Sequence, residues 1–342
     1  MVLPTCPVNL SILIYILISY LLFFSQNGQL SSAVSHSLEK LKKLSERLTE
    51  ANPQYDLDGR RNVWIVKPGA KSRGRGVVVH SRLEDVLKLV SSNMVREGKF
   101  VVQKYIERPL LIYHTKFDIR QWFIVTDWNP LTMWFFKDCY LRFCSQLFTL
   151  DSVDEAIHLS NNFVQANYSN AKERSPLLPS DNMWTSDTFK RYLKEVAGEP
   201  HVWDNKIYPG MRDAVIWALE SCQDVIVPRK NSFELFGADF MLTEDFQPWL
   251  IEINCSPCLA TSTSVTAKMC PQVQEDMLKI VLDRRIDKNA DVGRFELAFK
   301  QPTVVAPNYL GLSLSIEGQN CGSVDYFDFF SSLGGAFFYK SR

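Results

Sequence analysis

The sequence has no excess charge of either sign, because 38 lysine and arginine residues balance 38 aspartate and glutamate residues. Net charge therefore favours no nucleic-acid partner, and attraction to an acidic partner would have to come from local clusters such as residues 67–75. The eight cysteines follow no regular spacing, which argues against a disulfide-rich secreted domain and indicates a reducing compartment. Hydrophobic residues make up 46% of the chain, enough for one large domain or two closely packed lobes.

The N-terminal region contains an apolar run, residues 8–24, that has no lysine or arginine before it. A secretory signal peptide begins with a basic region, so the run lacks one of the features that define such a signal. A short membrane span is an alternative, and the cations that begin at Lys40 would then keep the downstream domain in the cytosol. A buried strand or helix is another. Residues 37–50 place leucines on one stripe and predict an amphipathic helix.

Hydrophobic patterns predict mixed strands and helices, and their order favours an α+β enzyme over a doubly wound sheet. We predict strands at 62–66, 77–80, 100–106, 116–127 and 139–145, and helices from 81 onward, at 186–197, at 209–226 and at 271–285. Residues 167–186 are polar and aperiodic, which predicts a loop. Residues 60–286 then form the main domain, between an atypical N-terminal segment (1–59) and a C-terminal extension (287–342) without a clear period.

Residues 236–254 consist of two apolar runs around a short polar connection, a pattern that predicts a β-hairpin. If Met241 pairs with Leu250, Asp239 lies opposite Glu252, with Cβ atoms about 5 Å apart. Asn254 shares the face of Glu252. The opposite face is expected to carry Ala238, Phe240, Ile251 and Ile253.

Two carboxylates that face each other on a mostly apolar ladder repel and are poorly solvated. A bound dication removes both problems, and oxygen donors from Asp239, Glu252 and Asn254 suit Mg²⁺. The alternative is a solvated acidic pair on an edge hairpin. The apolar neighbours favour the metal site.

A second group of charges lies on the strand predicted at 116–127. Lys116, Asp118 and Arg120 share one face of this strand, which suits an anionic, hydroxyl-bearing ligand such as a nucleotide or an amino acid. A solvated, salt-bridged strand face is the alternative. The apolar run 122–125 indicates a central strand and favours the site.

The basic, glycine-bearing loop at 67–76 lies between two predicted strands. It is neither a Walker A motif nor a dinucleotide fingerprint, because no G-K-[ST] ends it and no helix follows. Lys67, Lys71, Arg73 and Arg75 can close over phosphates, and the glycines let the backbone approach the phosphate oxygens. A basic surface turn is the alternative.

Three weaker signals depend on the others: residues 103–106 can present backbone groups to an adenine edge, Arg142 is a lone cation among aromatic residues, and residues 158–161 offer hydroxyl and amide groups. Cys255 and Cys258 have C-x-x-C spacing, but they follow Asn254 directly, which disfavours a thioredoxin-type redox motif. Asn254 also begins a formal glycosylation sequon. A glycan there would block the metal site, which again favours the cytosol.

Taken in order, these segments resemble the tubulin tyrosine ligase-like family of ATP-grasp ligases. The matching segments are 64–69 (WIVKPG), 73–77 (RGRGV), 103–106 (QKYI), 116–120 (KFDIR), 158–161 (HLSN), 237–239 (GAD) and 251–254 (IEIN). Residues 203–210 (WDNKIYPG) and 233–239 (FELFGAD) look most like the tubulin monoglycylases. The resemblance implies an ATP-grasp fold with antiparallel or mixed sheets and flanking helices.

The resemblance also implies roles for individual residues. It places Lys67, Arg73, Gly74, Arg75, Gly76, Val77, Gln103, Lys104, Tyr105, Ile106, Lys116, Asp118, Ser160 and Asn161 at the ATP site, and Asp239, Glu252 and Asn254 around Mg²⁺. Arg120 and Arg142 would position carboxylates, and Glu252 would also serve catalysis. The implied reaction phosphorylates a glutamate side chain of the tubulin tail, and the amine of free glycine then attacks the acyl phosphate.

The resemblance implies microtubules or ciliary axonemes in the cytoplasm as the place of action. A glutamate ligase of the same family is an alternative, but it would need a further cation near Arg120 to hold the second carboxylate. Residues 1–59 are shorter than the N-terminal lobe that the family usually carries, and Cys255 and Cys258 replace smaller or uncharged residues. A truncated, non-catalytic form that binds microtubules is therefore another alternative, as is a membrane-anchored protein.

Overall fold

The computed structural model describes residues 61–69, 74–91 and 99–302, and single or paired positions between 39 and 50. The described positions between 39 and 50 are all helical, in agreement with the helix predicted there. The apolar run 8–24 lies outside the described residues. Within the part of the chain that is described, no helix has both the length and the apolarity needed to cross a membrane.

The larger of two sheets has seven strands, and every pairing described in it is antiparallel. Its main path runs in the order β10 (Phe295–Lys300), β6 (Leu131–Phe143), β5 (Thr115–Trp128), β8 (Glu234–Leu242) and β9 (Pro248–Asn254). The short strands β4 (Leu111–Ile112) and β7 (Met183–Thr185) pair with β5 and β6. The strand β5 is therefore central, as predicted.

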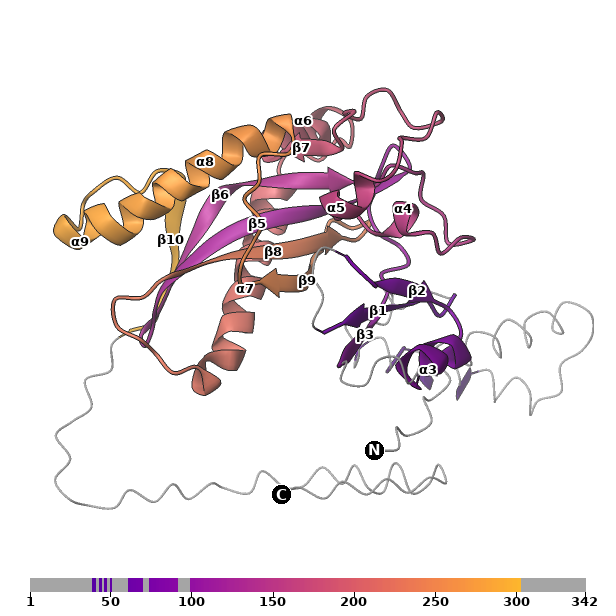
Figure 1. The fold of residues 1–342 in the computed structure, drawn as a ribbon, viewed down its shortest axis with the longest axis horizontal. Helices are drawn as coiled ribbons and strands as arrows, with labels where there is room; N and C mark the ends of the chain where they lie inside the picture. Colours follow the sequence, from indigo (N-terminus) through magenta and orange to yellow (C-terminus); the bar gives the residue numbers. More distant parts are fainter. Residues whose placement is uncertain are drawn as a thin grey trace, which may run out of the picture. The chain divides into compact units, whose positions relative to one another are not determined.

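Helices cover both faces of this sheet (Figure 1). The odd-numbered residues of β5, such as Phe117 and Ile119, pack in one core cluster with α6 (Ser186–Glu195) and α7 (Tyr208–Cys222). The even-numbered Trp122 and Ile124 pack on the other face in a second cluster with α8 (Ser264–Leu278). Lys116, Asp118 and Arg120 are also even-numbered and share this second face. The part of the face near residues 116–120 is therefore polar, whereas the part covered by α8 is apolar.

The smaller sheet has the order β2-β1-β3 and is also antiparallel. It consists of β1 (Trp64–Pro68), β2 (Val78–His80) and β3 (Phe100–Lys104), and α3 (Leu83–Ser91) follows β2. The basic loop connects β1 to β2. Its strand–loop–strand context is as predicted.

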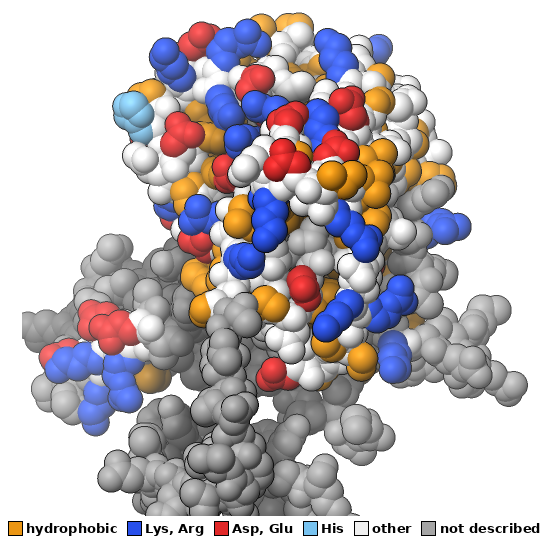
Figure 2. Space-filling model, turned by 90° about the vertical axis from the view of Figure 1, so that its left-hand side faces the viewer, with side chains coloured by type: hydrophobic (Ala, Val, Ile, Leu, Met, Phe, Trp, Pro, Cys, Tyr) orange, Lys and Arg blue, Asp and Glu red, His pale blue; other side chains and the backbone are white. Residues whose placement is uncertain are grey.

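Short helical segments complete the described structure. These are α4 (Glu155–His158), α5 (Asn162–Gln165), a π-helical turn at Trp203–Ile207, a 3-10 turn at Gln223–Val225, a second π-helical turn at Lys279–Asp283 and α9 (Arg284–Ile286). Figure 2 views the molecule from the left-hand side of Figure 1, and on that face cationic and anionic side chains are interspersed. Neither positive nor negative side chains therefore dominate this face.

The α+β prediction is confirmed, but four element predictions need correction. The strand predicted at 139–145 is only the second half of β6, and the loop predicted at 167–186 ends in β7. The helix predicted at 271–285 begins instead at Ser264, because Thr263 and Thr266 form a capping box there. The strand β10 was not predicted. It pairs with β6 beyond the predicted boundary at residue 286, and the first compact unit runs to Gln301.

The predicted register of the β8–β9 hairpin holds at only one end. Asp239 lies opposite Glu252, as predicted, but Met241 pairs with Trp249 rather than with Leu250. A bulge at Ile251 shifts the register by one residue between these pairs. As a result Ile251 lines a cavity and does not belong to the hydrophobic core on the opposite face of the sheet.

Candidate functional site

The candidate site lies where neighbouring strands of the larger sheet place polar side chains in one row. Glu252 on β9 is opposite Asp239 on β8, Asp239 is opposite Arg120 on β5, and Arg120 is opposite Tyr140 on β6. All four side chains project from the same face, because cross-strand partners share a face. The predicted Asp239–Glu252 juxtaposition is therefore one part of a longer row.

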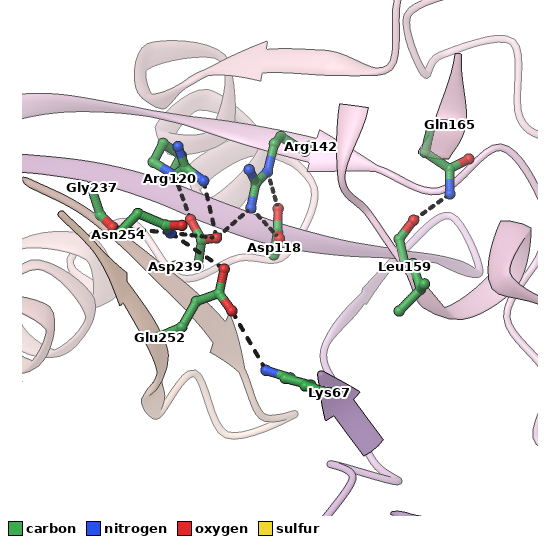
Figure 3. Close-up of polar contacts among 10 residues, drawn as sticks. All are labelled: Lys67, Asp118, Arg120, Arg142, Leu159, Gln165, Gly237, Asp239, Glu252 and Asn254. Carbon is green, nitrogen blue, oxygen red and sulfur yellow. Dashed lines mark hydrogen bonds and ion pairs between the residues drawn. The ribbon is translucent and has the colours of Figure 1, made fainter. Parts of the chain in front are cut away.

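Two arginines hold two buried aspartates beside this row (Figure 3). Arg120 donates from Nε to Asp239 Oδ1 at 2.5 Å and from Nη2 to Asp239 Oδ2 at 3.1 Å. Arg142, opposite Asp118 on the next strand, donates from Nε and Nη2 to both carboxylate oxygens of Asp118, at 2.7 and 2.5 Å. Its Nη2 also lies 3.0 Å from Asp239 Oδ2. Arg142 thus links the two aspartates.

The electrostatics of this group of two arginines and two aspartates favour the ionised forms of Asp239, Arg142 and Arg120. Burial alone would raise the pKa of Asp239, but Arg142 and Arg120 outweigh it and hold that pKa well below its usual value. Burial would lower the pKa of Arg142, but the carboxylates of Asp118 and Asp239 outweigh it and raise that pKa well above its usual value. The same opposition raises the pKa of Arg120.

Glu252 and Asn254 lie at the more open side of the cluster. The Glu252 side chain is 40% exposed, and its Oε2 lies 3.7 Å from Lys67 Nζ, which comes from β1 of the smaller sheet. Asn254 donates from Nδ2 to Glu252 Oε1 and Gly237 O, both at 3.3 Å, and to Asp239 Oδ2 at 3.5 Å. The three residues predicted as metal ligands are therefore neighbours (Figure 3).

A cavity of about 460 Å³ lies between the two sheets. Its lining includes the predicted residues Lys67, Gly74, Val77, Gln103, Lys104, Tyr105, Ile106, Lys116, Asp118, Ser160, Asn161, Asp239, Glu252 and Asn254. Lys67, Lys104 and Lys116 therefore line one space, as binding of a polyanion would require.

A second cavity, of about 530 Å³, shares Asn161, Glu252 and Asn254 with the first. Arg120 and Arg142 line this second cavity and not the first. The structure therefore separates the predicted residues into an amine-lined cavity and a guanidinium-lined cavity. The three shared residues lie between them.

The basic loop packs against the site where it is described. Gly74 has a φ of +76°, and a Cβ there would lie 2.8 Å from Val164 Cγ2 and 3.1 Å from Asn161 Oδ1. Arg75 and Gly76 are exposed and line neither cavity. Lys71 and Arg73 lie outside the described residues.

Sequence reasoning missed Glu107, a buried carboxylate beneath the first cavity. It accepts hydrogen bonds from the backbone N–H groups of Arg61 and Val63, each at 2.8 Å, and from Lys104 Nζ at 2.9 Å. Lys104 also donates to Val63 O at 3.1 Å. Glu107 therefore positions Lys104 and the start of β1. The sequence signal was the carboxylate directly after the segment 103–106.

His158, one of the weaker signals, has a structural role. Its Nε2 lies 2.7 Å from Ser152 O and must donate to that carbonyl, so Nδ1 accepts from Tyr105 OH at 2.8 Å. Burial lowers the pKa of His158, which favours the neutral ring that this pattern needs. The pair holds β3 against the segment that carries Ser160 and Asn161.

Comparison with known proteins gives matches over most of the chain. A model described as "Tubulin-tyrosine ligase family" matches residues 23–289. "Tubulin monoglycylase TTLL3" from Homo sapiens is 55% identical over 283 residues, which cover 82% of this chain and 36% of that protein. "Protein monoglycylase TTLL8" from Mus musculus is 52% identical over 301 residues, 87% of this chain and 36% of that protein. "Tubulin glycylase 3A" from Drosophila melanogaster is 46% identical over 299 residues, 86% of this chain and 30% of that protein.

The chain spans about a third of the length of these curated relatives. The resemblance to the monoglycylases that the motifs indicated is confirmed by these matches, and so is the prediction of an α+β fold of ATP-grasp type. Because the family model matches most of its length and two of these relatives are more than half identical to it, the chain belongs to the tubulin-tyrosine ligase family.

Proposed function

We propose that this chain is an ATP-dependent ligase that joins glycine to glutamate side chains of tubulin through an acyl phosphate. The observation that carries the proposal is the pair of cavities that share Asn161, Glu252 and Asn254. A ligase of this type must bring a phosphoryl donor and two carboxyl-bearing substrates to one point. An amine-lined cavity that meets a guanidinium-lined cavity suits that requirement.

The first cavity suits the nucleotide. Lys67 and Lys116 would contact phosphates as point charges, while Lys104 is already held by Glu107 and would keep a fixed position. The side chain of Lys67 approaches Glu252, so the terminal phosphate is expected next to the residues that both cavities share. The phosphoryl group would then face the second cavity.

The residues present also fit a bound Mg²⁺. Among the described residues no group of three or more His, Cys, Asp and Glu side chains could hold a metal, so the two carboxylates of Glu252 and Asp239 would be joined by the amide oxygen of Asn254. Mg²⁺ commonly uses one or two carboxylates and takes its other ligands from water and phosphate. Bound there, it would neutralise charge on the transferring phosphoryl group.

In the second cavity, Arg120 and Arg142 would orient carboxylates. The acceptor glutamate oxygen attacks the γ-phosphorus of ATP, ADP leaves, and an acyl phosphate forms. The glycine nitrogen then attacks the acyl carbon, phosphate leaves, and an isopeptide bond results. The buried cluster fixes both guanidinium groups before substrates arrive, which limits the reorganisation needed during reaction.

The cation content of the second cavity favours glycine over glutamate as the donor. Arg120 and Arg142 are the only cations among its described lining residues, and each already holds a buried aspartate. A glutamate donor would bring a second carboxylate that needs a further cation. The names of the relatives, which include monoglycylases, support the same choice. A glutamate ligase is the second candidate.

Tubulin as the acceptor rests on the names of the relatives, several of which are tubulin glycylases. From this we also propose cytoplasmic action on microtubules, including those of ciliary axonemes. The acidic tubulin tail would meet the cations of the basic loop and the second cavity.

Labelled glycine or glutamate, incubated with microtubules, ATP and Mg²⁺, tests the proposal. Glycine incorporation should fall at least about a hundredfold in Glu252→Gln, because the substitution removes one charge at the point of phosphoryl transfer. Glu244→Gln is the matched control, since Glu244 is exposed in the β8–β9 connection of the same hairpin. Glutamate incorporation would establish the second candidate instead. No incorporation of either by folded protein would favour a non-catalytic, microtubule-binding form.

A further inference from the structure

Cys255 and Cys258, which follow β9 directly, differ from the other described cysteines in their exposure. Both are exposed and unpaired, whereas Cys139, Cys144 and Cys270 are buried. Burial raises the pKa of Cys144 and that of Cys270, each to about 11, so neither forms a thiolate readily. Small oxidants therefore have better access to the exposed pair than to these buried thiols.

The segment that carries the pair contacts the candidate site directly. Asn254 immediately precedes Cys255, and Cys258 lines the second cavity. Between the cysteines, Pro257 packs against the backbone of Gly237, since a Cβ on Gly237 would lie 2.9 Å from Pro257 Cβ. The same Cβ would lie 3.1 Å from Arg120 Cδ. A change in the shape of this turn would therefore displace the neighbours of Arg120 and Asn254.

The segment that carries the cysteines belongs to neither a helix nor a strand. Residues 255–260 are irregular and lie after the end of β9 and before α8, which begins at Ser264. The motif therefore does not open a helix, as it does in thioredoxin-type oxidoreductases. Two residues separate the cysteines, which is the sequence spacing of a dithiol that can form a disulfide. Because the segment contacts the candidate site, a disulfide here would act on that site.

We propose that Cys255 and Cys258 form a disulfide when the protein meets hydrogen peroxide, and that this reversibly inhibits the neighbouring site. The sulfur of one cysteine attacks the peroxide, which gives a sulfenic acid and a molecule of water. The second thiol then attacks the sulfenic sulfur, forms the S–S bond and releases another water. Two thiols are oxidised and one peroxide is reduced, and a dithiol reductant reverses the change. The inhibition rests on the proposed function, whereas the disulfide does not.

Peptide mass tests the disulfide without any assay of activity. Trypsin releases residues 231–268 as one peptide, which contains Cys255 and Cys258 and no other cysteine. After peroxide treatment and alkylation of free thiols, we expect this peptide unalkylated and lighter by two hydrogen atoms. Alkylation of both thiols, separate oxidation of each to a sulfinic acid, or a cross-link to the peptide of Cys270 would each overturn the proposal.

The inhibition is tested by measuring the glycine incorporation of each protein preparation before and after its treatment with peroxide. After peroxide treatment, glycine incorporation by wild type and by Cys222→Ser should fall on the order of tenfold or more, because displacements of about 1 Å at an active site lower the rate by that much or more. Dithiothreitol should restore the activity. Cys258→Ser should show no peroxide-dependent loss, and an equal loss in that variant would refute the inhibition. If reduced wild type incorporates no glycine, the proposed function fails, and the peptide mass still decides the disulfide.

Discussion

Replacement of Arg142 by glutamine should destabilise the fold strongly, because Arg142 is the cation shared by two buried carboxylates. Its side chain is 7% exposed, and it contacts Asp118 and Asp239. Removal of one partner from a buried ion pair costs about 3–5 kcal/mol, since the charge left behind stays desolvated. Total stabilities of about 5–15 kcal/mol are usual, so this loss should be visible as a much lower urea midpoint at neutral pH.

The pH dependence of that loss tests its electrostatic origin. The pKa of Asp239 is lowered in the folded protein, so its ionised form stabilises the fold above the unfolded-state pKa, and this contribution is lost as pH falls through the folded-state pKa. In Arg142→Gln one of the two groups that lower this pKa is gone, and the carboxylate takes up a proton at higher pH. The wild-type contribution is fully present above the unfolded-state pKa of about 3.9, so the difference from wild type should shrink as pH falls below about 4.

Arg294→Gln is the matched control for Arg142→Gln. Arg294 also holds a carboxylate through two parallel hydrogen bonds, both of 2.7 Å, to Asp138. Its side chain, however, is 51% exposed, so the loss should stay below about 1 kcal/mol. Equal losses in the two variants, or a loss in Arg142→Gln that does not change with pH, would refute the argument from burial.

Three glycines give further predictions. Gly293→Ala should cost about 3–4 kcal/mol, because φ is +58° and the new Cβ would lie 1.9 Å from Asp276 Oδ1; Gly198→Ala, with φ of +73° and no atom within 4 Å, should cost only about 1–2 kcal/mol. Urea unfolding measures both, and similar costs would contradict the clash. Gly237→Ala should lower ligase turnover on the order of tenfold or more by displacing Arg120 while the thermal shift caused by ATP persists. Unchanged turnover would count against the packing argument.

The parts of the site that the sequence predicted depend on local rules. Lys116, Asp118 and Arg120 share a face because side chains alternate along one strand. Asp239 and Glu252 lie on neighbouring strands because a short connection joins those strands, although the register next to that connection differs by one residue from the prediction. Even there, the bulge at Ile251 escaped prediction, because the sequence of β9 contains no glycine or proline at that point to mark it.

Elements that depend on distant partners were not predicted. The strand β7 has three residues and is held by β6, and β10 pairs with β6 across more than 150 residues of sequence. Each strand is too short for its alternating hydrophobic pattern to be recognised from the sequence alone. The contact of Glu107 with the start of β1 is of the same kind, since a lone carboxylate does not reveal which backbone N–H groups it will accept from.

The role of the arginines changes the argument for a metal at this site. From the sequence alone, repulsion between Asp239 and Glu252 predicts a bound dication. In the structure Arg120 and Arg142 already compensate Asp239, and Lys67 approaches Glu252. The registers of β5 with β6 and with β8 decide which cations lie beside which carboxylates. Those strand pairings join residues far apart in sequence, so the sequence alone did not reveal these contacts. Repulsion therefore no longer argues for Mg²⁺. The exposure of Glu252 and its position between the two cavities favour Mg²⁺ instead, because a phosphate there would complete the ligand set.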